Sequence, residues 1–175
     1  MEGQPPHRPA PLQQKVEFRF EKGEAVLPEL EELSRNPLVK GIRRIIQFEA
    51  DPDFCLRPDF IRGVRLLPRF GWTFDICISH DQVPTALRFV EQCPEVKFVV
   101  DHIAKPDIRG RRLEPWKSGM KQLAGFPNVH CKVSSLATEA DHRNWTIEDL
   151  KPYVEHVFEC FGMERTFFGG DWPVS

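Results

Sequence analysis

The stretch that decides the fold class of this 175-residue chain runs VKFVVDHIAKP, from Val96 to Pro106. Its first five residues form a short run that is apolar except for Lys97, and this run passes directly into Asp101 and His102. Such runs are typical of strands buried in a parallel sheet. Ligands bind at the carboxyl ends of parallel strands, because the loops converge there. The stretch therefore predicts a strand of an α/β fold that ends at a functional edge.

Strand-like runs of the same kind recur and alternate with helical patterns. The strands are expected at 41–47, 73–79, 96–100, 128–133 and 165–168, and the helices at 25–35, 58–69, 83–93, 114–124 and 147–161. Successive strands begin about 24–37 residues apart, the length of a β-α-β unit. Near-continuous apolar strands favour burial on both faces by helices. The pattern predicts an α/β protein built on parallel strands.

The N-terminal part of the chain differs from the rest. Residues 1–14 hold four prolines and show no hydrophobic period, so we expect a disordered tail there and one domain at 15–175. From Lys15 to Glu24, apolar and charged residues alternate, which predicts a strand with one wet face. Its charges favour a place at the edge of the sheet.

Composition excludes several classes of protein. A net charge of −2 offers no basic field for nucleic acid, and no apolar run reaches the ~20 residues of a membrane span. No secretory signal is visible, so the sequence favours a cytoplasmic protein. The five cysteines are widely spaced and are interpreted as buried, reduced thiols. Phosphate-binding glycine loops and the serine nucleophile elbow are also missing.

Polar residues lie at or just after the carboxyl end of every expected strand. These ends are Gln47 with Glu49, Ser79-His80-Asp81, Asp101-His102, Ser134-Ser135 and Asp171. Any one of them is explained by a strand that emerges into water. Five such ends in register indicate a ligand site at one edge of the sheet.

The sharpest candidates are a histidine and an aspartate. His102 follows a buried run directly, where a neutral imidazole could bind a metal or polarise a carbonyl group; a purely structural histidine fits the same place. Asp171 stands between Gly169-Gly170, which permit a tight turn, and the stiff Trp172-Pro173. Its carboxylate could deprotonate a water or bind a metal that does so, and the alternative is an aspartate that stabilises a turn.

Other side chains complete the candidate set. His80 ends a neighbouring strand, and Lys105 could hold an anionic or carbonyl oxygen. Arg43, Arg44 and Lys132 project from strands, and one or two of them could bind a substrate carboxylate.

These residues resemble a known family. The stretches that carry the likeness are Pro37 to Arg43, Asp51 to Phe54, Val99 to Pro106, Cys131 to Ser134 with Thr138-Glu139, and Gly169 to Pro173. They resemble the amidohydrolase-related (amidohydrolase 2) proteins, and most of all the branch that contains fucono- and rhamnonolactonases. The likeness runs from about Ala25 to the end of the chain.

The resemblance implies a (β/α)₈ TIM barrel that hydrolyses lactones or related esters and amides. His102 then matches the family histidine and Asp171 the general base, and both are ligands in metal-dependent members. Trp172, next to Asp171, is taken as a substrate contact. The cofactor is one divalent ion, Zn²⁺ or Mn²⁺, or none, because some members of this branch are thought to need no metal.

The chain also departs from the family pattern. The family begins with a His-x-His strand, and this sequence contains no His-x-His. Arg44 stands where many relatives have histidine. With only five or six strands, we expect an incomplete barrel that lacks its first strands and has two open edges.

Three hypotheses follow. In the first, Asp171 activates water for attack on a small polar lactone, while His102, His80 and Lys105 stabilise the oxyanion. In the second, the chain is an inactive barrel fragment or isoform that only binds, self-association through its open edges included. The third is a five-stranded doubly wound binding domain.

Overall fold

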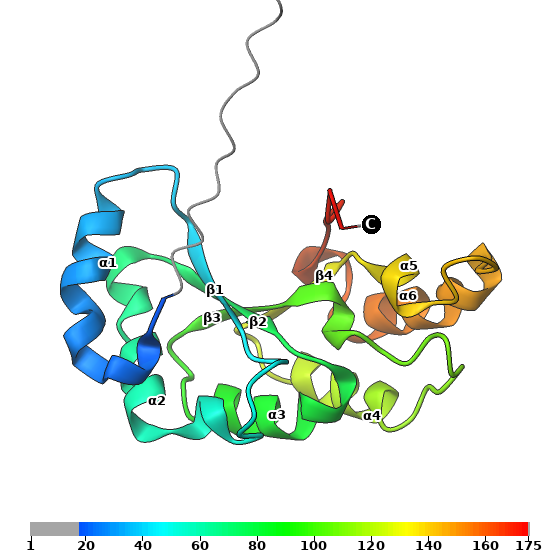
Figure 1. Cartoon of the computed structure of the whole chain (residues 1–175), viewed down its shortest axis with the longest axis horizontal. Helices are drawn as coiled ribbons and strands as arrows, with labels where there is room; N and C mark the ends of the chain where they lie inside the picture. Colours follow the sequence, from blue (N-terminus) through cyan, green and yellow to red (C-terminus); the bar gives the residue numbers. More distant parts are fainter. Residues whose placement is uncertain (1–17, 175) are drawn as a thin grey trace, which may run out of the picture.

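A parallel sheet of five strands lies at the centre of the computed structural model, which describes residues 18–174 (Figure 1). The expected tail at 1–14 lies outside these residues. The strands are β1 (Gly41–Ile45), β2 (Thr73–Cys77), β3 (Lys97–Val100), β4 (Val129–Val133) and β5 (Thr166–Phe168). They follow one another in chain order, and every neighbouring pair is parallel. The predicted α/β class and its five strands are confirmed.

Helices connect the strands, as expected for β-α-β units. They are α1 (Leu27–Ser34), α2 (Pro58–Val64), α3 (Val83–Glu91), α4 (Trp116–Ala124), a short α5 (Leu136–Glu139) and α6 (Ile147–Phe161). Single 3₁₀ turns lie at Phe54–Leu56, Leu67–Phe70, His80–Gln82, Asp101–Ala104 and Met163–Arg165. None of the helices within 18–174 combines the length and apolar character that a membrane crossing demands.

The longest helix, α6, begins where a capping box places it. The backbone N–H and the hydroxyl of Thr146 each donate a hydrogen bond of 2.9 Å to Asp149 Oδ2. The helix ends before Gly162, whose φ of +68° suits glycine. A hydroxyl at the N-cap and glycine after the last turn thus define α6 from the sequence alone.

Apolar side chains pack between the helices and one face of the sheet. Five buried phenylalanine rings form a chain of edge-on contacts with centroids 5.3–6.1 Å apart, namely Phe20, Phe60, Phe74, Phe89 and Phe98. Each such pair contributes about 0.5–1.5 kcal/mol beyond the burial of its surface. This cluster joins α2 and α3 to the middle strands.

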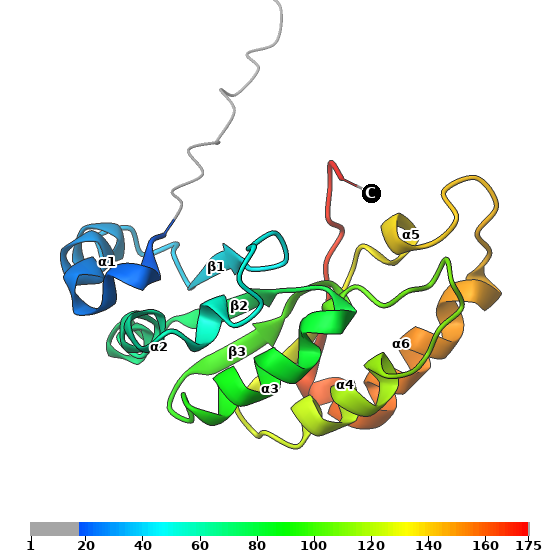
Figure 2. The same ribbon diagram turned by 60° about the horizontal axis from the view of Figure 1, so that its bottom comes forward.

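The other face of the sheet is polar, which differs from the expected burial on both faces. Alternate residues of the strands, among them Asp75, Lys97, His130 and Lys132, line a cleft of about 530 Å³ there. Figure 2 shows the larger helices on a single side of the sheet. Within 18–174, the sheet is therefore the wall of an open half-barrel, with helices outside and charged side chains inside.

The strand predicted from Lys15 to Glu24 is wrong in its described part. Residues Phe20–Val26 form a 3₁₀ segment with a break at Gly23, where φ is +60°. Phe18 and Phe20 are both buried. A Cβ on Gly63 would lie 2.6 Å from the carbonyl oxygen of Phe20, so α2 packs directly on this backbone. The alternating apolar residues serve this contact rather than a sheet edge.

Candidate active site at the carboxyl ends of the strands

His102 lies on an unusual left-handed turn directly after β3. Four consecutive residues, His102 to Lys105, have φ between +43° and +56°. For residues other than glycine this conformation costs about 1–2 kcal/mol each. Burial of Ile103 and a 2.6 Å hydrogen bond from Trp116 Nε1 to the Ile103 carbonyl oxygen hold the turn in place. Strain of this kind is concentrated at functional sites.

Asp171 reaches the same place from the end of β5. The Gly169 N–H donates to the carbonyl oxygen of Val133 at 3.1 Å, which continues the pairing of β5 with β4. A Cβ on Gly169 would lie 3.0 Å from Lys132 Cδ and 3.3 Å from Ser134 Cβ, so a larger residue here would have to displace these side chains. Asp171 then takes φ +50°, and its Oδ1 lies 3.8 Å from His102 Nε2.

Two consecutive serines after β4 contact this pair. The Oγ of Ser134 lies 2.8 Å from His102 Nδ1, and the Ser135 hydroxyl donates a hydrogen bond to Asp171 Oδ2. Both serines are buried. The nitrogen and oxygen that face each other across the site are therefore the two that the serines leave open.

A buried carboxylate lies behind His102. Asp101 has no exposed surface and forms ion pairs with Lys132 Nζ at 2.5 Å and with Arg43 Nη1 at 3.6 Å. Asp75 lies 3.8 Å from Lys132 on the same inner face. Burial first of all, and then the charge of Asp101, raise the pKa of the Asp75 carboxyl. Arg43 and Lys132 are therefore both paired with the buried Asp101 carboxylate.

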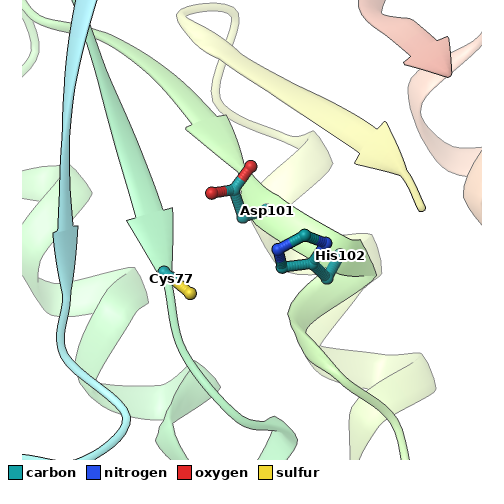
Figure 3. Close-up of side chains that lie close together, drawn as sticks. All are labelled: Cys77, Asp101 and His102. Atoms are coloured by element: carbon teal, nitrogen blue, oxygen red, sulfur yellow. The ribbon is translucent and has the colours of Figure 1, made fainter. Parts of the chain in front are cut away.

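Cys77, Asp101 and His102 form the one group in 18–174 whose ligand atoms could surround a metal ion. A thiol sulfur, a carboxylate oxygen and an imidazole nitrogen lie within 4.8 Å of one another at the ends of β2 and β3 (Figure 3). These donor types suit Zn²⁺. The Asp101 Oδ2 atom accepts no hydrogen bond and lies 3.6 Å from Arg43 Nη1, so an ion at this oxygen would compete with the Arg43 guanidinium. Burial raises the pKa of the Cys77 thiol, which favours the imidazole and carboxylates as ligands.

The remaining candidates lie around the turn at 102–105. His80 Nδ1 is 3.0 Å from the carbonyl oxygen of Lys105, and the Lys105 ammonium is 3.9 Å from Glu139 Oε1. Trp172 is 86% exposed beside Asp171. The structure therefore brings together His102 and Asp171, holds His80 against the Lys105 backbone at the end of the turn, and leaves Trp172 at the surface.

Burial governs the protonation of His102. It is the largest influence on the imidazole and lowers its pKa, against the opposing charges of Asp101 and Asp171. A neutral ring is what carbonyl polarisation or metal binding requires. The site thus offers a carboxylate and a neutral imidazole at one edge of the sheet.

Comparison with known proteins identifies the family of this fold and site. The amidohydrolase family model matches residues 7–175. The chain belongs to this family.

Among its relatives is the L-fucono-1,5-lactonase of Burkholderia ambifaria, 38% identical over 143 residues, which make up 82% of this chain and 49% of that enzyme. The L-rhamnono-gamma-lactonase of Scheffersomyces stipitis is 27% identical over 156 residues, which make up 78% of this chain and 46% of that enzyme. The chain thus spans about half the length of these curated relatives.

Solved amidohydrolases share the fold. A Burkholderia multivorans amidohydrolase crystallised with zinc superposes with a TM-score of 0.80 at 31% identity, over 89% of this chain and 56% of its own. A second crystal form of an amidohydrolase from that organism, with bound HEPES, gives a TM-score of 0.79 at 30% identity, over 89% and 57%. The five-stranded sheet is accordingly a part of an amidohydrolase barrel.

Sequence reasoning missed several members of the site. The sequence places Asp101 and the two serines at strand ends without assigning them a role, and it indicates only a buried thiol at Cys77. All five cysteines are free, four of them are buried, and Cys160 is partly exposed. One signal was available for Asp101 and Cys77: alternation along β2 and β3 places both on the inner face with Asp75.

Proposed function

We propose that this site is the active site, in whole or in part, of a hydrolase that directs water at the carbonyl carbon of a small polar lactone or a related ester or amide. One observation carries the proposal: His102 Nε2 and Asp171 Oδ1 face each other 3.8 Å apart at the carboxyl ends of β3 and β5. At this separation a single water or substrate atom beside the pair could contact both groups. The likeness to lactonases supports a lactone as the substrate.

Asp171 is the general base in this proposal. It accepts a proton from the attacking water while the water oxygen bonds to the carbonyl carbon. His102 donates a hydrogen bond to the developing oxyanion, and the Lys105 ammonium adds positive charge. His80 holds the Lys105 backbone through the contact of its Nδ1 with the Lys105 carbonyl oxygen. The ring C–O bond then breaks, and the proton held by Asp171 passes to the leaving oxygen. The product is an open hydroxy acid.

Substrate contacts are assigned to Arg43, Lys132 and Trp172. The first two already pair with buried Asp101, so their charge is partly balanced before a substrate arrives. Trp172 offers an exposed apolar surface next to the general base. We expect the indole to contact the sugar ring, and the two cations to orient its hydroxyl or carboxylate groups.

One divalent ion, Zn²⁺ or Mn²⁺, fits the donors that the site presents. His102 and Asp171 are the proposed ligands, and Cys77 or Asp101 lies close enough to His102 to add a third. A bound ion would act as a Lewis acid toward the carbonyl oxygen. The roles of Asp171 in proton transfer and of Lys105 in oxyanion binding do not depend on it.

Turnover of lactones by the purified chain tests the proposal. A pH-indicator assay over a panel of aldonolactones, with and without added Zn²⁺ or Mn²⁺, would compare wild type with Asp171→Asn. Asp53→Asn removes a charge from the exposed pair with Arg88 and is the matched control. We expect turnover that Asp171→Asn abolishes and Asp53→Asn retains. A folded protein that hydrolyses none of these lactones would contradict the proposal.

A second candidate follows from the outer strands of the sheet. Within residues 18–174 these are β1 and β5, and Phe168 on β5 is 81% exposed. Residues 15–175 would then be a partial barrel domain without catalysis, which binds other chains or further copies of itself through β1 and β5. The lactone assay separates the two candidates, since only the first predicts turnover that depends on Asp171.

A further inference from the structure

Ser134 and Ser135 point in the same direction, although neighbouring residues of an extended strand point in opposite ones. Ser134 continues the alternation of β4 and faces inward like Lys132. Ser135 has φ +60°, which reverses the expected direction of its side chain. Both hydroxyls therefore reach the candidate site from one short segment.

The two hydroxyls contact different partners. Each binds the polar atom that is turned away from the gap between His102 and Asp171. Ser134 Oγ is 2.8 Å from His102 Nδ1, and Ser135 Oγ bonds to Asp171 Oδ2. The near atoms, His102 Nε2 and Asp171 Oδ1, are left to face each other. Thr138 stabilises the backbone at Ser135, because its hydroxyl donates a hydrogen bond of 2.6 Å to the Ser135 carbonyl oxygen.

This geometry selects one tautomer of the neutral imidazole. Nε2 faces a carboxylate, so a proton is favoured on Nε2. Nδ1 is then an acceptor, and the Ser134 hydroxyl donates to it. Ser135 donates to the carboxylate in the same way and fixes the rotation of Asp171. A hydroxyl behind each reacting group thus sets which atom meets the substrate.

We infer that Ser134 and Ser135 are positioning residues: with no ion bound, Ser134 holds His102 as its Nε2-protonated tautomer, and Ser135 holds the carboxylate of Asp171. Their catalytic meaning rests on the proposed function, whereas the hydrogen bonds themselves can be tested without it. Neither serine touches the reacting atoms.

Kinetics form the first test. Ser134→Ala, Ser135→Ala and Ser135→Gly should each lower kcat about 10- to 100-fold and leave KM within about twofold, because the groups are misplaced and not lost. Ser135→Gly suits the positive φ, so its deficit would come from the hydroxyl and not from backbone strain. Ser34→Ala on α1 is the matched control and should keep wild-type kinetics. Unchanged kcat in Ser134→Ala and Ser135→Gly would overturn the inference.

Nuclear magnetic resonance forms the second test and needs no activity. In ¹⁵N-labelled protein, long-range ¹H–¹⁵N spectra distinguish the two ring nitrogens, and His102→Gln identifies the His102 signals among the six histidines. We expect a protonated Nε2 in wild type and a mixture of tautomers in Ser134→Ala. The ¹³C signal of the Asp171 carboxylate should shift in Ser135→Gly and not in Ser34→Ala.

The two tests separate the inference from the proposed function. A chain without turnover but with both spectral changes would refute the lactonase proposal and keep the positioning roles. A proton on Nδ1 in wild type, or spectra that neither serine variant changes, would refute the positioning roles whatever the activity.

Discussion

At the scale of single residues, His102 couples the candidate site to stability. Burial lowers the pKa of the folded imidazole below its ordinary 6.5. Because the folded pKa is the lower one, the unfolded chain takes up a proton first as the pH falls. His102 therefore contributes stability above about pH 6.5, and the contribution is lost as the pH falls through the folded pKa.

We expect His102→Gln to flatten this part of the pH dependence. Urea unfolding of wild type and variant at a series of pH values between about 7.5 and 5 measures it, and each pKa unit between the two states corresponds to about 1.4 kcal/mol. The free energies of unfolding should converge toward the acid end. Parallel curves for the two proteins would contradict a lowered pKa.

At the scale of elements, the left-handed turn after β3 should accommodate glycine better than alanine. Lys105→Gly and Lys105→Ala both remove the ammonium near Glu139, but only glycine takes φ +43° without a steric penalty. Glycine avoids the backbone strain of about 1–2 kcal/mol that alanine has at a positive φ. This gain is larger than the cost of about 0.4–1 kcal/mol that arises because glycine makes the unfolded chain more flexible. Lys105→Gly should therefore be more stable than Lys105→Ala by about 1 kcal/mol in urea unfolding.

A helical position provides the comparison. Lys121 lies exposed within α4, so there Lys121→Gly should be less stable than Lys121→Ala by about 1 kcal/mol. The opposite order at the two sites is the expected result. The same order at both would mean that the turn carries no strain.

The helices and strands also show which parts of the fold can be predicted from sequence and which cannot. Each of the five predicted strands of the sheet differs from the observed one by at most two residues at either end, because burial in the sheet requires the apolar runs that the sequence shows. The strand predicted from Lys15 to Glu24 fails in its described part, because α2 packs through Gly63 onto the backbone of Phe20. That contact is made by residues some 40 positions away, which no local pattern predicts.

The candidate site was predictable only in part for a related reason. Strand ends led to His102 and Asp171, because parallel strands bring such ends together. The positive φ values at His102, Ser135 and Asp171 then change the direction of each side chain. The alternation of side chains along a strand does not predict these changes of direction. The contacts of Ser134 and Ser135 are therefore seen only in the structure.

At the scale of the whole molecule, both edges of the sheet lie open within residues 18–174. β1 and β5 are the outer strands of the five, and exposed apolar side chains accompany them. Phe168 on β5 is 81% exposed, and Leu38 and Phe48, on either side of β1, are 83% and 81% exposed. An open edge with apolar neighbours is a template for pairing with another chain.

We expect the purified chain to self-associate through these edges, so that its sedimentation coefficient rises with concentration. Phe168→Lys puts a charge on the β5 edge, which opposes strand pairing, and should shift the chain toward the monomer. Ile147→Lys replaces a residue of similar exposure, 74%, at the start of α6 on the helical side of the sheet. This control should associate as wild type does. A wild-type chain that stays monomeric at every concentration, or equal effects of the two substitutions, would show that the edges do not pair, and the partial barrel would then have to be stable with its inner face open to water.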